Sequence, residues 1–195
     1  MTAIIDYDAG NIKSVCCALE RLGEQYTLTS DPAIIRTAEK VILPGVGNDA
    51  EAMEKLRERG LVEVIRSRRK PVLGICVGMQ VMCNRSEEGD CECMGIFDAD
   101  VRRFTPTPDA KVPHMGWNAV RNLDSKLFKG IDSGSYLYFV HSYYAGLCPD
   151  TIATCSHAGV LFSAALKYEN FYGTQFHPEK SGEAGEAVLK NFLAL

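Results

Sequence analysis

The sequence contains no run of about 20 consecutive apolar residues, the length that a membrane-spanning helix requires. It also lacks an excess of basic residues, because the formal net charge is −4 at pH 7. Such a chain has no general electrostatic attraction for nucleic acid or for an anionic membrane, so we expect neither as a partner. The apolar start of the chain carries an acidic residue and is typical of a buried strand, which indicates a cytoplasmic protein.

A basic cluster is present only at residues 66–70 (RSRRK). It follows the end of an expected helix, where cations complement the helix dipole. We therefore expect a solvated cluster rather than a binding patch for an anionic partner.

Paired CxxC spacings, which mark structural zinc sites, are missing, although the chain has eight cysteines. Most of them lie in apolar stretches, where cysteine acts as a small hydrophobic residue, and a reducing cytosol argues against a disulfide scaffold. Cys83, Cys91 and Cys93 could be imagined as metal ligands, but their spacing does not favour it. We predict no metal and no cofactor. The cysteines are Cys16, Cys17, Cys76, Cys83, Cys91, Cys93, Cys148 and Cys155.

Internal repeats and low-complexity linkers are also absent, so residues 1–195 are expected to form one domain. In the first half, short apolar runs alternate with segments of helical spacing. This alternation predicts a parallel sheet covered by helices on both faces. The expected strands are 2–7, 25–29, 40–43 and 72–75, and the expected helices are 12–22, 32–37, 48–58 and 61–68.

After about residue 95 the pattern changes to strands with few helices between them. This half of the chain is therefore expected to be mixed or antiparallel, until a last helix at 183–193. In open α/β sheets, sites lie at the carboxyl ends of the parallel strands, and Cys76 falls at such an end. The expected strands are 96–104, 117–121, 136–144, 151–157, 161–168 and 171–176.

The stretch Gly74-Ile-Cys76-Val-Gly78 has the form of a nucleophile elbow. In such a turn the nucleophile has a strained backbone, and the residues two positions away pack too closely for large side chains. The turn would place the sulfur at a helix N-terminus, where amide groups favour the thiolate. The alternative is a buried cysteine in an ordinary strand-to-helix turn, and the pentapeptide alone does not decide between them.

A thiolate that performs acyl transfer needs an acid–base partner. His177 ends an expected strand, and Glu179 would point to the same side if the chain stayed extended through Pro178. A carboxylate there could orient the imidazole and stabilise its protonated form. The alternative is a strand-end histidine beside a solvated glutamate.

The loop Pro44-Gly-Val-Gly47 follows another expected parallel strand. Its glycines would allow backbone N–H groups to face the site, together with the N–H of Val77, and so to form an oxyanion hole. A glycine pair in such a loop is also a plain turn. The three parts together, at compatible strand ends, favour an active site.

Taken together, Gly74-Ile-Cys76-Val-Gly78-Met-Gln80, the loop 44–47 and His177-Pro-Glu179 resemble the class I glutamine amidotransferases over the whole chain. The motifs at 6–11, 113–118, 138–143 and 177–181 are similar to those of the glutaminase subunits of imidazole glycerol phosphate synthase. Val77 stands where that family more often has leucine. The resemblance implies a single-domain, three-layer flavodoxin-like α/β fold.

The resemblance also implies roles for individual residues. Cys76 would attack the carboxamide of glutamine, His177 would act as acid and base, and Glu179 would orient His177. Val46, Gly47 and Val77 would form the oxyanion hole. The implied glutamine-binding residues are Gly45, Gly47, Gln80, His141, Ser142 and Tyr143.

The implied partner is a (β/α)₈-barrel cyclase subunit, which would receive the ammonia in a heterodimer and use it in histidine biosynthesis. The residues implied to face or to couple with this partner are Asn11, Met115, Trp117, Tyr138 and Lys180. Three alternatives stay open: the glutaminase subunit of another synthase, such as pyridoxal phosphate synthase, a γ-glutamyl cysteine hydrolase, or an inactive flavodoxin-like module.

Overall fold

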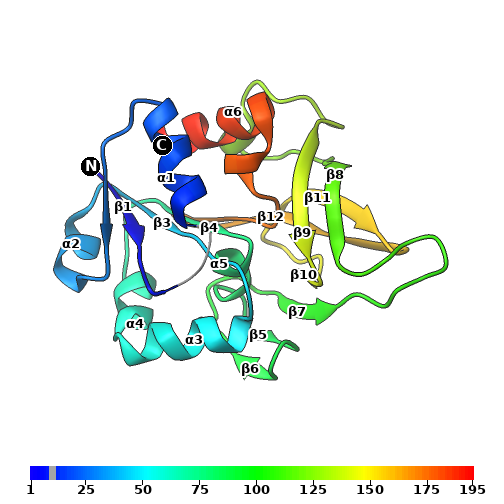
Figure 1. Cartoon of the computed structure of the whole chain (residues 1–195), viewed down its shortest axis with the longest axis horizontal. Coiled ribbons are helices and arrows are strands. Elements are labelled where there is room, and N and C mark those ends of the chain that lie inside the picture. Colours follow the sequence, from blue (N-terminus) through cyan, green and yellow to red (C-terminus); the bar gives the residue numbers. More distant parts are fainter. Residues whose placement is uncertain (9–11) are drawn as a thin grey trace.

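The computed structural model describes residues 1–8 and 12–195, and within them the main sheet has seven strands (Figure 1). Their order is β11-β12-β13-β4-β3-β1-β2. The five strands from β13 to β2 pair in parallel, and β11 and β12 add an antiparallel edge. The strands are β1 (Thr2–Ile5), β2 (Tyr26–Thr29), β3 (Lys40–Leu43), β4 (Val72–Ile75), β11 (Thr151–His157), β12 (Val160–Tyr168) and β13 (Phe171–Thr174).

Helices cover this sheet on both faces, as predicted. In Figure 1, α1 and α6 lie above the sheet and α3 and α4 lie below it. The strands β1, β4 and β13 are buried along their whole length, which explains their continuous apolar runs. The helices are α1 (Ile12–Arg21), α2 (Pro32–Thr37), α3 (Asp49–Glu58), α4 (Leu61–Arg66), α5 (Val77–Gln80) and α6 (Gly182–Leu193), with 3₁₀ turns η1 (Lys126–Phe128) and η2 (Pro178–Lys180).

Among the described residues, no helix is both long enough and apolar enough to cross a membrane. The N-terminus of α3 is capped by Asn48, whose side-chain oxygen accepts from the backbone N–H groups of Ala50 and Glu51. This cap fixes where the loop after β3 ends and the helix begins.

From residue 85 onward the described residues also form two smaller sheets, of order β10-β7-β5-β6 and β8-β9. The expected strand 136–144 is wrong as a single element, because it breaks at Ser142. The residues before the break pair with β8, whereas those after it pair with β7. The strands are β5 (Arg85–Ser86), β6 (Cys91–Glu92), β7 (Asp100–Arg103), β8 (His114–Ala119), β9 (Tyr136–His141) and β10 (Tyr143–Ala145).

The expected strand 96–104 is also shorter than predicted, because only residues 100–103 form β7. The preceding N–H groups bond to the turn after α5 instead of to a sheet: Gly95 donates to the carbonyl of Cys83, and Ile96 donates to that of Met82. The expected strand 117–121 begins earlier, at His114. These are errors of pairing, which periodicity does not report.

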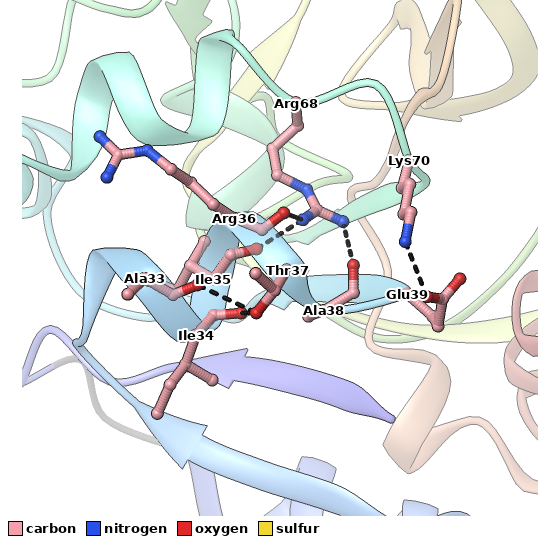
Figure 2. Close-up of polar contacts among 9 residues, drawn as sticks. All are labelled: Ala33, Ile34, Ile35, Arg36, Thr37, Ala38, Glu39, Arg68 and Lys70. Atoms are coloured by element: carbon pink, nitrogen blue, oxygen red, sulfur yellow. Dashed lines mark hydrogen bonds and ion pairs between the residues drawn. The ribbon is translucent and has the colours of Figure 1, made fainter.

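The basic cluster at 66–70 does not form one solvated patch. Arg68 is only 4% exposed, and its guanidinium group donates to the carbonyl oxygens of Ile35, Arg36 and Ala38 at the end of α2 (Figure 2). Lys70 Nζ forms an ion pair with Glu39 at 2.7 Å. The cluster therefore complements the dipole of the preceding helix through Arg66, which lies in the last turn of α4 as expected, and Arg68 also caps the end of α2.

Candidate active site

Cys76 lies directly after β4 and directly before α5, in the corner that the sequence predicts. Its φ of 55° is in the left-handed region, which residues other than glycine rarely adopt. A Cβ atom at Gly78 would lie 1.9 Å from the carbonyl oxygen of Leu43, and one at Gly74 would lie 2.5 Å from the carbonyl oxygen of Gly78. Both glycines are therefore required by close contacts of the elbow with its neighbours.

His177 approaches Cys76 because β13 and β4 are parallel neighbours, with Gly173 opposite Gly74. The backbone N–H of Cys76 extends this ladder and donates to the carbonyl of Thr174 at 2.7 Å. His177 is held by a second strand, because its backbone N–H donates to the carbonyl of Tyr138 on β9 at 2.9 Å. The sheet thus fixes the nucleophile candidate and the histidine relative to each other.

Glu179 reaches His177 by a route other than the expected one. The chain does not stay extended through Pro178 but turns into η2 at that residue. His177 Nδ1 nevertheless lies 2.8 Å from Glu179 Oε1, and the two side chains are 1% and 0% exposed. Burial lowers the pKa of His177, but the interactions with Cys76 and Glu179 raise it by more, so that the net shift is upward.

Cys76 lines a cavity of about 370 Å³. The loop after β3 forms one wall, and it lies against the elbow: a Cβ atom at Gly45 would be 2.8 Å from the N atom of Gly78. Of the residues implied to form the oxyanion hole or to bind glutamine, all except Gly45 line this cavity. The lining residues are Val46, Gly47, Cys76, Val77, Gln80, Glu88, Pro113, Val140, His141, Ser142 and Tyr143.

Residues 3–195 match the family Glutamine amidotransferase class-I. This chain belongs to that family. It is 54% identical over 194 residues to the imidazole glycerol phosphate synthase subunit HisH of Bacteroides fragilis strain YCH46, and the match covers 99% of this chain and 98% of the relative. HisH subunits of Bacteroides thetaiotaomicron (99% and 98% coverage) and Yersinia pestis (98% and 98%) are 52% and 45% identical, respectively.

Solved structures agree on the fold of this amidotransferase. A putative GMP synthase subunit from Thermoplasma acidophilum has a TM-score of 0.74 at 23% identity, and the match covers all of this chain and 92% of that one. A structure described as a glutamine amidotransferase has a TM-score of 0.75 at 16% identity, with coverage of 98% and 97%. The predicted α/β fold, with a mostly parallel sheet and a more antiparallel second half, is confirmed.

Two polar residues of the site escape sequence reasoning: Glu88, which lines the cavity, and Gln175, which lies beside the sulfur of Cys76. Glu88 lines the cavity, and burial raises its pKa although it accepts from the backbone N–H of Asp49 at 2.9 Å. In the sequence, the pair Glu87-Glu88 is typical of a solvated turn, so nothing marks Glu88 as a residue of the site. Gln175 is fully buried and precedes His177 by two positions, so strand alternation could have placed both on the same side.

The residues implied to face a partner lie away from the cavity. Met115 and Trp117 are 64% and 53% exposed on one face of β8, and the ring of Trp117 lies 6.1 Å from that of half-buried Tyr138 on β9. Lys180 is exposed at the end of η2. Asn11 lies outside the described residues.

The amidotransferase has no group of three or more His, Cys, Asp or Glu side chains arranged to hold a metal ion within residues 1–8 and 12–195. The sulfur atoms of Cys91 and Cys93 lie 3.9 Å apart. Burial raises the pKa of Cys83 and of Cys93, which favours the thiol over the thiolate that binds metals.

Proposed function

We propose that this amidotransferase hydrolyses glutamine at Cys76 and passes the ammonia to a cyclase subunit of imidazole glycerol phosphate synthase, in histidine biosynthesis. The observation that carries the proposal is that Cys76, His177 and Glu179 meet beside one cavity, in a chain about half identical to HisH subunits over its whole length. That likeness favours this role over a subunit of another synthase or a free-standing hydrolase. The presence of all three side chains argues against an inactive module.

The reaction begins when the Cys76 thiolate attacks the carboxamide carbon of glutamine and the carbonyl electron pair moves onto oxygen. The backbone N–H groups of Val46, Gly47 and Val77 stabilise this oxyanion. Protonated His177 then gives its proton to the leaving nitrogen as the C–N bond breaks, which releases ammonia and leaves a glutamyl thioester. His177 next removes a proton from water, which attacks the thioester and frees glutamate and the thiolate.

The charged end of glutamine binds among the lining residues Gln80, Ser142 and Tyr143. Glu88 adds a carboxylate to the lining of the same cavity. An ammonium group is a donor without acceptor capacity, so the half-buried carboxylate of Glu88 is the natural partner for the α-amino group of the substrate. Gly45 contributes by its contact with the elbow rather than by contact with the substrate.

The cyclase docks on the exposed face of β8 and β9, around Trp117 and Tyr138, with Lys180 at the rim. Aromatic residues such as the exposed Trp117 and the half-buried Tyr138 are enriched at the centres of protein interfaces. A closed passage to the partner has a chemical reason, because ammonia that escapes into water at neutral pH is mostly protonated and no longer a nucleophile.

The test combines the purified chain with a (β/α)₈-barrel cyclase subunit and its ribulosyl-formimino substrate. We expect glutamine to support formation of imidazole glycerol phosphate only when both subunits are present, with one glutamate released per product. A catalytically intact cyclase that forms product from ammonium chloride, but not from glutamine in the presence of this chain, would refute the proposal.

A further inference from the structure

Gln175 is a buried amide with an unusual neighbour. Its side chain is 0% exposed, and its Nε2 lies 3.6 Å from the sulfur of Cys76. A polar amide in the core destabilises the fold unless its hydrogen-bonding groups are satisfied. The sulfur is the acceptor that the Nε2 group of Gln175 faces.

The orientation of this amide is set by a backbone carbonyl. Gln80 Nε2 lies 2.9 Å from the carbonyl oxygen of Tyr143 and 2.9 Å from Oε1 of Gln175. A carbonyl can only accept, so Gln80 must present its NH₂ group there, and its second N–H then meets the oxygen of Gln175. The NH₂ group of Gln175 is therefore the end that faces Cys76. Reversing Gln80 would place two oxygen atoms against each other.

The carbonyl of Tyr143 is itself held in place by a pair of histidines. His141 Nδ1 lies 2.6 Å from it, and His141 Nε2 lies 2.9 Å from Nδ1 of His114, the residue opposite His141 in the β8–β9 pairing. His114 Nε2 in turn lies 3.1 Å from Nδ2 of Asn118. Burial lowers the pKa of His141 to about 3 and of His114 to about 4, so both rings are neutral at pH 7.

Because both histidine rings are neutral and the Tyr143 carbonyl can only accept, the donor of each hydrogen bond in this series is determined. Asn118 donates to His114, His114 donates to His141, and His141 donates to the carbonyl of Tyr143. Both nitrogen atoms of each ring are used, so this pair neither transfers protons to the substrate nor binds a metal. It fixes the segment of residues 141–143, which forms one wall of the cavity.

We propose that Gln175 is a further catalytic residue that donates a hydrogen bond to the Cys76 thiolate, with Gln80 and the His114–His141 pair as positioning groups. The inference rests on the proposed role of Cys76 as nucleophile. An anionic sulfur is a much stronger acceptor than a thiol, so the bond stabilises the reactive form. The same bond weakens when the sulfur becomes a neutral thioester, which leaves the acylated enzyme free to react with water.

The test measures alkylation of Cys76 by iodoacetamide, read on the Cys76 peptide by mass spectrometry, because this readout requires no turnover. In Gln175→Met, which keeps the length but removes the donor, we expect alkylation to fall about tenfold at about pH 7 and to approach the parent rate at about pH 10. In Gln175→Glu, which is nearly isosteric, a carboxylate beside the sulfur should slow alkylation at least as much. Either variant decides the question if the other does not fold.

The matched control is Thr174→Val, since Thr174 is an equally buried polar neighbour whose hydroxyl has no hydrogen-bond partner among the described residues. It should keep the parent profile. Glutaminase assays with the cyclase should show a lower kcat for the Gln175 variants and little change in KM. The inference would be overturned if the parent is alkylated at Cys76 and the Gln175 variants show the same pH profile of alkylation. That result would leave the proposed function intact. Absence of glutaminase activity in the parent would contradict the proposed function alone.

Discussion

His177 and Glu179 are two residues apart, yet a 3₁₀ turn rather than an extended strand brings Nδ1 within 2.8 Å of Oε1. The carboxylate fixes the Nδ1–H form of the ring, which leaves Nε2 as the nitrogen that would exchange protons in the proposed reaction. Nε2 is buried, and no described atom meets hydrogen-bonding geometry with it. It is therefore placed to serve the sulfur or the leaving group rather than the fold.

Replacement of Glu179 by glutamine should lower kcat by roughly 10²–10⁴-fold, because the protonated ring loses its counter-charge. KM should change much less, since Glu179 does not line the cavity. Steady-state glutamate release, measured with the cyclase present, separates the two effects. The control is Glu183→Gln, an exposed residue at the start of α6. An unchanged kcat would show that Glu179 does not act on His177.

Cys76→Ser should keep the fold and the partner but abolish glutamine hydrolysis. The hydroxyl is nearly isosteric, but its much higher pKa leaves almost no anion for attack. Ammonium supplied in solution at high pH should still drive the cyclase reaction, because that chemistry belongs to the other subunit. Hydrolysis of glutamine by the serine variant at the parent rate would exclude Cys76 as nucleophile.

Gly78→Ala should destabilise the protein by about 3 kcal/mol or more, because the added methyl group would meet the Leu43 carbonyl oxygen at 1.9 Å. The measurement is the midpoint of urea unfolding. Gly146→Ala is the control, because its added Cβ atom would have only an ordinary contact at 3.9 Å and its φ is not positive. Equal midpoints would mean that the elbow is not packed against β3.

The contribution of His114 and His141 to stability should decline below about pH 6.5 because both are buried as neutral rings. The unfolded chain binds protons near pH 6.5, whereas the folded rings take them up only near pH 4 and pH 3, so acid favours the unfolded state. The stabilisation is complete above pH 6.5 and is lost as the pH falls toward 4. His114→Gln should reduce the slope of the unfolding free energy between these values by at most about 1.4 kcal/mol per pH unit. Identical slopes would contradict neutral burial.

Glutaminase activity should be low in the isolated chain and should rise at least about a hundredfold with the ligand-bound cyclase. The physical basis is the peptide at Val46, which has glycine on both sides and could turn its N–H toward or away from the oxyanion. Gly47 has a φ of 107°, and nothing lies within 4 Å of its Cβ position. Glutamate release is compared for the chain alone, with cyclase, and with cyclase and ligand. Equal rates would show that the loop is fixed in its active form.

The sequence predicts the elbow correctly because that turn depends on residues adjacent in the chain. The two glycines around Cys76, the apolar run before it and the helical pattern after it are all local signals. The parallel half of the sheet follows for the same reason, since each βα unit has its own periodicity. Even the link between the basic cluster and a helix terminus is predictable, although local sequence does not reveal which helix Arg68 meets.

The remaining features depend on which strands become neighbours. The break at Ser142 arises because β9 and β10 pair with different sheets, and an unbroken apolar alternation contains no information about partners. Glu88 reaches the cavity only because the turn after β5 folds back onto α3. The contact between Gln80 and Gln175 joins residues 95 positions apart, so neither residue alone indicates the other.

The positive φ of Cys76 has a consequence for how this protein can change. A side chain in that conformation carries about 1–2 kcal/mol of strain that glycine would not have. At position 76, the proposed reaction therefore requires cysteine, whereas the stability of the fold favours glycine. Selection for thermal stability alone would favour Cys76→Gly, which relieves the strain. The same change would remove the thiol on which the proposed activity depends. A cysteine in this conformation therefore agrees with the role proposed for Cys76, because packing alone would favour glycine.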